Sequence, residues 1–316
     1  MKKEEYTIRS ADGISDLHAV KWMPEREAKA VIHLTHGMVE HIRRYVDFAR
    51  FLNEAGFVAA GHDHIGHGDS VRSLEELGDM QAEHPADVMT ADMMAHIRLL
   101  RGQYPSVPFF VLGHSMGSYL LRKMMSEYAE ELRSLGVRGA ILLGTGSVSP
   151  LVLKSGLMLI GGMAKIRSWK YRSPLVAGLV TGGPFSEYDA SGQDLSRSSL
   201  TKDTTIARAY LEDPKCGFRF TLRGYKGLLE ACAYDNDPDN IAKISKDLPV
   251  LFASGDRDPV GDMGKGVTKA YEQFVNAGIN DVTLRLYKGD RHEILNELDR
   301  DMVYRELLQW MQERMH

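Results

Sequence analysis

Cysteine is scarce in this chain, which has only Cys216 and Cys232 among its 316 residues. Two cysteines allow at most one disulfide, so we expect a reducing compartment in which both thiols are small core side chains. Positive charge is not in excess either, because the net charge at pH 7 is −4. That balance disfavours nucleic acid as the main partner, since no surplus of Lys and Arg exists to neutralise phosphates.

Long apolar runs are also missing. No stretch of about twenty apolar residues occurs, so no segment is expected to span a membrane. The first residues, Met-Lys-Lys-Glu-Glu-Tyr, lack the apolar region of a signal peptide, and we expect a cytoplasmic protein. The remaining composition, 43% hydrophobic and 26% charged, is ordinary for a soluble globular protein. The length fits one large domain, or one domain with an insertion.

The most informative stretch begins with a short apolar run at residues 107–112, which predicts a strand buried on both faces. It is followed by Gly113-His-Ser-Met-Gly117, a match to the nucleophile elbow G-x-S-x-G. A helix is predicted next, because four apolar residues recur at helical spacing: Leu120, Leu121, Met124 and Met125. Strand, tight turn and helix are the context that this motif requires, so Ser115 is the predicted nucleophile.

Strands and helices alternate on both sides of the motif. The predicted strands are residues 6–9, 17–23, 30–34, 57–60, 107–112, 139–143, 249–253 and 282–287. The predicted helices outside the elbow are residues 42–55, 86–101, 222–233, 262–277 and 299–316. This alternation predicts a mostly parallel sheet with helices on both faces. It breaks after the sixth strand, so we expect residues 147–233 to form a mainly helical cap, inserted into a core of residues 1–146 and 234–316.

A serine hydroxyl needs a base that a third group orients. The loop after the strand at 249–253 holds Asp256 and Asp258, and the loop after the strand at 282–287 holds His292. The order Ser, Asp, His is the order of an α/β-hydrolase. Spacing alone does not choose between the two aspartates, although Asp256 is predicted to stabilise its turn. We expect the neighbours of His292, Asp290 and Glu293, to be solvated.

The oxyanion hole needs two backbone N–H donors. One is predicted at Met116, which follows the nucleophile, and its helix N-terminus adds a partial positive charge. The other is predicted at Met38, in the loop after the strand at 30–34. Both assignments rest on position, because a backbone donor does not constrain the side chain.

A competing pattern is His62-Asp-His64-Ile-Gly-His67, which is similar to the H-x-H-x-D-H of binuclear metallohydrolases. Gly66 stands where that motif has Asp, and no second ligand set follows at matching spacing. We therefore interpret this segment as a polar loop beside the active site. Three residues of the preceding loop are likewise interpreted as hydrogen-bonding groups rather than metal ligands: His36, Glu40 and His41.

Taken together, these motifs resemble the monoacylglycerol lipase and lysophospholipase branch of the α/β-hydrolase superfamily. The resemblance rests on His36-Gly-Met-Val-Glu-His41 with Arg44-Tyr45, on residues 62–70, on the elbow, on Gly255-Asp-Arg-Asp258 and on Arg291-His292-Glu293. It implies the α/β-hydrolase fold, Asp258 as the triad acid, oxyanion donors at Met38 and Met116, and neither metal nor cofactor. It also implies a monoacyl lipid substrate, either a lysophospholipid or a monoacylglycerol. The related label serine aminopeptidase says little about peptide cleavage.

Two other functions are compatible with the sequence. The first is a short-chain esterase or an aminopeptidase with the same triad, whose amine pocket could use Glu187, Asp189 or Asp194. The second is a non-catalytic binding protein on the same fold, which the complete triad disfavours. An apolar segment of the cap could cover an acyl chain, contact a membrane peripherally, or simply pack onto the core: Leu151, Val152, Leu153, Leu157, Met158, Leu159 and Ile160.

Overall fold

One eight-stranded sheet runs through the computed structural model, which describes residues 1–189 and 191–316. The strand order is β1-β2-β4-β3-β5-β6-β7-β8. β1 pairs antiparallel with β2, and β2 with β4, while the pairs from β4 to β8 are parallel. The strands are β1 Lys2–Arg9, β2 Asp16–Met23, β3 Ala30–Thr35, β4 Phe57–His62, β5 Phe109–His114, β6 Val137–Leu143, β7 Val250–Gly255 and β8 Val282–Tyr287. The predicted α/β-hydrolase sheet is confirmed.

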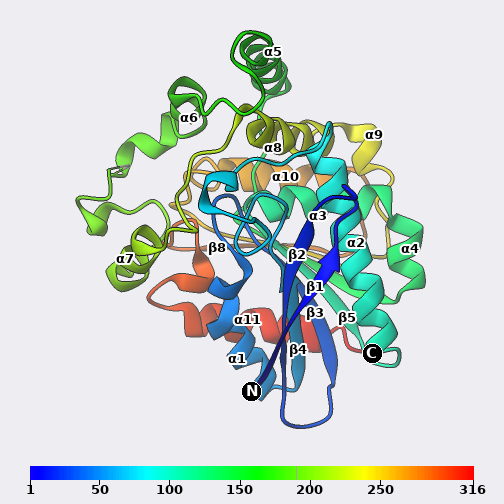
Figure 1. The fold of residues 1–316 in the computed structure, drawn as a ribbon. Helices are drawn as coiled ribbons and strands as arrows, with labels where there is room; N and C mark the ends of the chain where they lie inside the picture. Colours follow the sequence, from blue (N-terminus) through cyan, green and yellow to red (C-terminus); the bar gives the residue numbers. More distant parts are fainter. Residues whose placement is uncertain (190) are drawn as a thin grey trace.

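Helices cover both faces of the sheet, as predicted (Figure 1). α1 (Val46–Glu54) and α11 (Arg300–Gln312) pack on one face. α2 (Pro85–Gln103), α3 (Met116–Glu127) and α10 (Lys265–Asn276) pack on the other. The central strands β3, β4, β5 and β7 are buried at every position, as expected for parallel strands covered on both sides.

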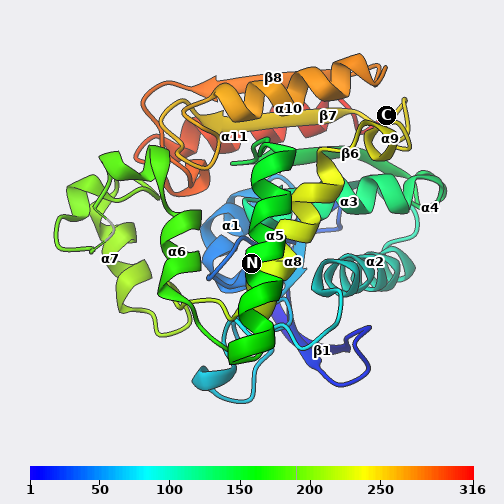
Figure 2. The same cartoon turned by 90° about the horizontal axis from the view of Figure 1, so that it is seen from above.

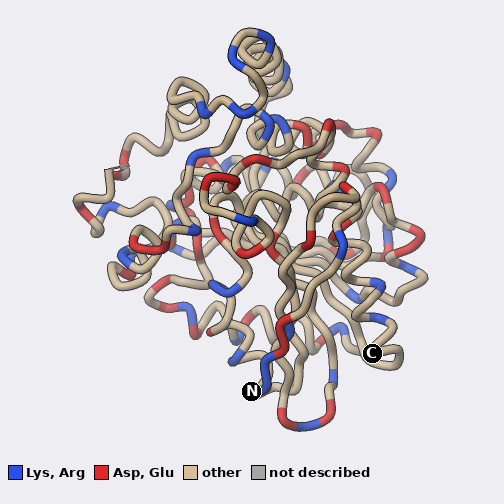
Figure 3. The backbone as a smooth tube through the Cα atoms, viewed as in Figure 1, with Lys and Arg blue, Asp and Glu red and all other residues tan. Residues whose placement is uncertain are grey.

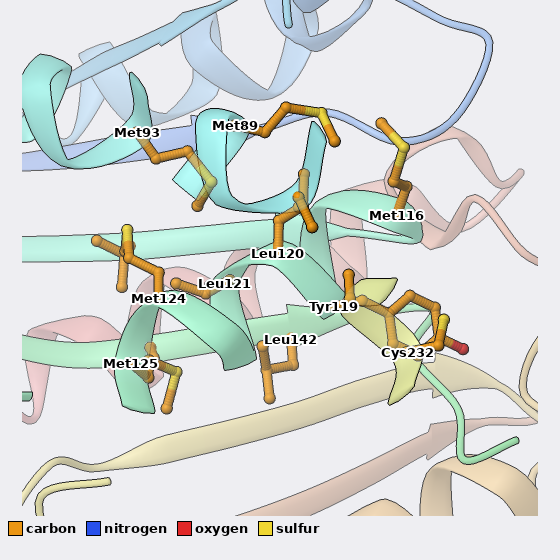
Figure 4. Packing of buried hydrophobic residues seen from close by; sticks show 14 of the residues in the cluster. Met89, Met93, Met116, Tyr119, Leu120, Leu121, Met124, Met125, Leu142 and Cys232 are labelled. Atoms are coloured by element: carbon orange, nitrogen blue, oxygen red, sulfur yellow. The ribbon is translucent and has the colours of Figure 1, made fainter. Parts of the chain in front are cut away.

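The packing around α3 is rich in methionine (Figure 4). Met89 and Met93 of α2 lie over Leu120 and Met124 of α3, and all four side chains are fully buried. Methionine has three rotatable bonds and fills irregular gaps between helices. The helix that follows Ser115 is therefore held firmly against both the sheet and α2.

The chain between β6 and β7 is mainly helical. It contains α5 (Pro150–Arg167), α6 (Pro174–Val180), α7 (Thr204–Glu212) and α8 (Leu222–Asp235), with two short 3-10 turns between α6 and α7. α5 and α8 lie above the core in Figure 1, whereas α6 and α7 extend to one side of it, as the view from above in Figure 2 also shows. Residue 190, inside the predicted cap, lies outside the described residues. The Arg122 guanidinium of α3 donates to the Gly146 carbonyl at 2.9 Å and to the Asp235 carbonyl at 3.0 Å. One buried cation thus contacts both ends of the segment, close to the predicted boundaries at 146 and 234, which stay a proposal.

Several boundaries differ from the prediction for local reasons. β1 begins at Lys2 rather than residue 6, because its charged residues occupy an exposed edge strand. The helix predicted at 262–277 begins at Lys265, since Asp262 and Met263 have φ of 49° and 52°. The helix predicted at 42–55 starts as the 3-10 turn Ile42–Tyr45 before α1. Outside the cap, two short helices were not predicted: α4 (Ala129–Ser134) and α9 (Pro238–Ile241).

Candidate active site

Ser115 occupies the turn between β5 and α3 with φ 52° and ψ −121°. A positive φ is uncommon for a residue with a side chain and costs on the order of 1–3 kcal/mol, so the surroundings must hold it. Its N–H donates to the Leu143 carbonyl of β6 at 2.9 Å, and its carbonyl accepts from the Ser118 hydroxyl at 2.6 Å. The elbow predicted from the motif is present.

The two glycines of the elbow allow a close approach of backbones. A Cβ on Gly113 would lie 2.3 Å from the Gly117 carbonyl oxygen, and a Cβ on Gly117 would lie 2.4 Å from that of Thr35. Both separations are shorter than real Cβ contacts. A larger residue in place of either glycine would therefore push α3 away from the ends of β3 and β5. The turn that aims Ser115 out of the sheet therefore requires the glycines.

Asp258 and His292 meet across the loops that follow β7 and β8. The His292 Nδ1 lies 3.0 Å from the Asp258 Oδ1, and both residues are buried. Burial favours the neutral form of Asp258. The charge of His292 and hydrogen bonds from His292, Ser254 and the Val260 N–H outweigh it, so the pKa of Asp258 is lowered. An ionised carboxylate accepts the Nδ1 proton and leaves the Nε2 of the imidazole as the basic nitrogen.

Asp256, the other candidate, hydrogen-bonds to the backbone of a neighbouring turn and not to His292. Its Oδ1 accepts the Gly289 N–H at 2.7 Å and so ties the loop after β7 to the turn after β8. That is the turn-stabilising role expected for it. Of the two aspartates that spacing left open, Asp258 is the one that contacts His292, and its role as the triad acid stays a proposal.

The loops that carry His292 and Ser115 lie against each other. The ring of His114, the residue before Ser115, lies against the His292 ring with centroids 4.7 Å apart and the two planes tilted by 42°. A Cβ on Gly144 would lie 3.0 Å from the His292 Nδ1, and Ser115 is bonded to the adjacent Leu143. The imidazole is therefore seated over the ends of β5 and β6, beside the elbow.

Met116 and Met38 lie at the two positions expected for oxyanion donors. Met116 is the first residue of α3, where backbone N–H groups have no partner inside the helix. Met38 follows Gly37, whose Cβ position would be 3.0 Å from the Ser115 Cβ. The loop after β3 thus passes directly beside Ser115. The donor role of both residues remains a proposal.

A buried ionic network supports this loop, and sequence reasoning missed it. Glu40 accepts from the Gly37 N–H at 2.6 Å, from Tyr45 at 3.0 Å and from Arg44 at 2.7 Å, and His114 lies 3.1 Å away. Burial favours neutral Glu40, but the charge of Arg44 and the hydrogen bond from His114 hold its pKa well below the ordinary value. In the sequence, Glu40 and Arg44 belonged to the motif that carries the family resemblance, and nothing there indicated that they pair with each other.

The prediction that Asp290 and Glu293 are solvated is wrong. Arg44 donates two hydrogen bonds of 2.7 Å to the carboxylate of Glu293, which is 4% exposed. Asp290 is fully buried and pairs with Lys202 at 2.7 Å. Charged residues near a loop end are usually at the surface. Here the two carboxylates are buried because Arg44 and Lys202, which are distant in the sequence, neutralise their charge.

The predicted polar loop beside the site is a buried one. His64 and His67 are fully buried and pack on the ring of His36, with centroids 4.4 and 5.1 Å from it. His36 donates through Nδ1 to the Gly37 carbonyl and accepts the His64 N–H. His41 pairs with Asp213 at 2.8 Å. His36, Glu40 and His41 are hydrogen-bonding groups, as expected.

Comparison with known proteins agrees with this architecture. The family model described as serine aminopeptidase, S33, matches residues 26–299. The chain belongs to this hydrolase family. It is 28% identical to the monoglyceride lipase of Homo sapiens, covering 93% of this chain and 86% of that protein. It is 24% identical to the monoacylglycerol lipase of Mycolicibacterium smegmatis, covering 98% and 97%.

Solved structures give the same fold over the whole chain. A thermostable carboxyl esterase from Bacillus coagulans, crystallised in complex with glycerol, superposes with a TM-score of 0.88, 26% identity and full coverage of both chains. A lipase in an open form superposes with a TM-score of 0.86 and 25% identity, again with full coverage. The family and fold implied by the sequence motifs are confirmed.

Proposed function

We propose that this carboxylic ester hydrolase cleaves monoacyl lipids through Ser115, His292 and Asp258. The observation that carries the proposal is the seating of His292, which Asp258 holds through Nδ1 while the ring lies against the elbow. His292 Nε2 takes the proton of Ser115 as the hydroxyl attacks the acyl carbonyl. The charged imidazolium is stabilised by Asp258 and then protonates the leaving alcohol. Water hydrolyses the acyl-enzyme by the same route.

The negative charge of the tetrahedral intermediate falls between the loop after β3 and the start of α3. We assign its two hydrogen-bond donors to the N–H groups of Met38 and Met116. The Glu40 network supports this assignment, because it fixes Gly37, the neighbour of Met38. Donors held rigidly before reaction stabilise the transition state without reorganisation.

A monoacylglycerol is the favoured substrate, because two of the similar proteins are named monoacylglycerol or monoglyceride lipase. A similar carboxyl esterase crystallised with glycerol supports an alcohol group of that kind. Lysophospholipids and short-chain esters remain the alternatives. An aminopeptidase is less well supported, since Asp189 and Asp194 accept hydrogen bonds from their own loop and Glu187 is exposed.

The cap offers a surface for contact with lipid. Leu153 and Ile160 of α5 face the core, whereas six large apolar residues of α5 and α6 are exposed: Leu151, Val152, Met158, Ile166, Leu175 and Leu179. No Asp or Glu occurs between residues 147 and 186, which include five Lys and Arg. Figure 3 shows that the charged residues along α5 are all basic. Apolar and basic groups together suit peripheral binding to an anionic membrane surface. Among the described residues, no helix is long and apolar enough to cross a bilayer.

The decisive experiment compares rates on a monoacylglycerol, lysophosphatidylcholine and p-nitrophenyl esters of rising acyl length, for wild type and Ser115→Ala. We expect long-chain monoacylglycerol to have the highest kcat/KM, and Ser115→Ala to lose on the order of 10⁶-fold in kcat. Ser134→Ala, on the surface of α4, is the control. Activity confined to short esters would contradict the lipid substrate and keep the triad. Full activity of Ser115→Ala would refute the mechanism.

Membrane contact is tested separately by sedimentation with vesicles of phosphatidylcholine alone or mixed with phosphatidylglycerol. Wild type should bind the anionic vesicles, and the double variant Leu151→Glu, Met158→Glu should bind them less. Leu298→Glu removes an exposed leucine outside the cap and should bind as wild type does. Equal binding by all three proteins would exclude α5 as the contact surface.

A further inference from the structure

Three histidines from three elements converge in the core, away from Ser115. His33 lies in β3, His62 ends β4, and His96 lies in α2, which covers this face of the sheet. His33 pairs in register with Ala60, so His62, two residues further along β4, points to the same side. All three side chains are buried, among the apolar residues that join α2 to the sheet.

Their nitrogen atoms are spaced as metal ligands. The His96 Nδ1 lies 3.3 Å from the His33 Nε2 and 3.1 Å from the His62 Nδ1, and the three ligand atoms are all within 4.8 Å of one another. Bonds of about 2.0–2.1 Å from a tetrahedral zinc ion place two ligand nitrogens about 3.3 Å apart. The two short separations match that value.

Hydrogen bonds alone do not satisfy this cluster. A neutral imidazole has one N–H and one lone pair, so the His96 Nδ1 either donates to one neighbour or offers one lone pair to both. The neutral imidazole is the form that binds a metal ion, through the lone pair of one ring nitrogen. One ion at the centre would use three lone pairs at once.

The outer nitrogens of two of the rings already have suitable partners. The His96 Nε2 lies 2.5 Å from the Tyr6 hydroxyl, and the His33 Nδ1 lies 3.4 Å from the Thr35 hydroxyl. Ligating histidines commonly use the second nitrogen in this way, which fixes the ring and its tautomer. The His62 Nε2 is buried with no partner.

We propose that His33, His62 and His96 bind a single transition-metal ion, with zinc as the expected occupant. Three imidazoles suit zinc, and a tetrahedral ion held by them would take a water molecule as its fourth ligand. The ion would join β3, β4 and α2 and so fix the start of the loop at residues 63–70, which packs on His36. It would be structural, because it takes no part in the chemistry at Ser115. The segment that the sequence likened to a metallohydrolase motif would thus contribute one ligand, His62, and not His64 or His67.

The test measures metal in protein expressed with added zinc chloride, then desalted and analysed by mass spectrometry. We expect about one zinc ion per chain, falling to background in His33→Phe and in His96→Leu. His67→Gln, a buried histidine outside the cluster, should keep its metal. Refolding the metal-free protein with Co²⁺ should give the intense visible absorption of a tetrahedral site, absent in the two variants.

Melting curves provide an independent readout, since an ion that binds only the folded chain raises its melting temperature. Zinc should raise the value for wild type and His67→Gln and leave His33→Phe unchanged. If wild type takes up neither zinc nor Co²⁺ on refolding, the proposal is overturned whether or not the variants fold. Equal metal content in wild type and His96→Leu would also overturn it. Esterase activity is not used as a readout, so failure here is distinct from failure of the proposed mechanism.

Discussion

Replacing Arg44 by Met should show how much this arginine contributes to the free energy of unfolding. Arg44 donates to both Glu40 and Glu293, and its side chain is 11% exposed. The methionine fills similar space but supplies no charge, so two buried carboxylates lose their main partner. Removing one member of a buried ion pair typically costs about 3–5 kcal/mol. We expect the free energy of unfolding to fall by at least that amount, because two carboxylates are affected here.

The effect should depend on pH, with a defined sign. The pKa of Glu40 and that of Glu293 are lowered in the folded protein, since Arg44 outweighs their burial. Their contribution is therefore present above the unfolded pKa of about 4.3 and is lost as the pH falls through the folded pKa. In Arg44→Met, burial raises both values, and the variant regains stability as the carboxyls take up protons. The difference between the proteins should shrink from pH 7.5 to pH 5.

Urea unfolding at both pH values measures this difference. The matched control is Arg43→Met, because Arg43 is 38% exposed and pairs with Glu5 at the surface, where ion pairs contribute about 0–1 kcal/mol. The double variant Arg44→Met, Glu293→Gln should recover part of the loss. A loss below about 1 kcal/mol for Arg44→Met at pH 7.5, or one equal to that of Arg43→Met, would refute the reasoning.

Two further variants test the triad and the cap. Asp258→Asn should lower kcat about 10⁴-fold, because the amide stabilises the wrong histidine tautomer, whereas Asp256→Asn keeps an acceptor for Gly289 and should change kcat by less than about tenfold; similar losses in the two would contradict the assignment. Arg122→Met removes the two charged hydrogen bonds to the ends of the cap, should cost about 3 kcal/mol, and should speed limited proteolysis within residues 147–233. The control is Arg133→Met, because Arg133 is exposed, and equal cleavage rates in the two variants would contradict a role of Arg122 in holding the ends of the cap.

The parts of the site that the sequence predicted are those that local chemistry determines. The elbow needs a strand, two glycines and a helix within about twenty residues, and all of them are consecutive in the chain. His292 and Asp258 follow two strands whose carboxyl ends lie at one edge of a parallel sheet. The network of Glu40, Arg44 and Glu293 was not predicted, since it joins residues 249 positions apart. A charged residue carries no local sign of the partner that permits its burial.

The helices of the cap also differ in how well the sequence predicted them. α8 was predicted as a helix over residues 222–233, and one side of it packs against the core. α6 and α7 were not predicted, since each is short and buries little more than one residue, Val176 in α6 and Ala207 in α7. A short helix that buries a single residue gives few apolar positions from which to recognise it. The cap was therefore recognised by a loss of alternation rather than by its own elements.

Glycines mark the places where the loops of the site converge. A Cβ would lie 2.8 Å from the Glu40 Oε1 at Gly37, 3.0 Å from His292 at Gly144, and 2.0 Å from the Asp290 carbonyl oxygen at Gly255. Each of these glycines lies at or just after the end of a strand, where a side chain would push one loop away from the next. The closeness of Asp258 and His292 is thus set by backbones that approach without side chains between them. These glycines are present in the sequence, but which loop packs against each of them is determined by the fold.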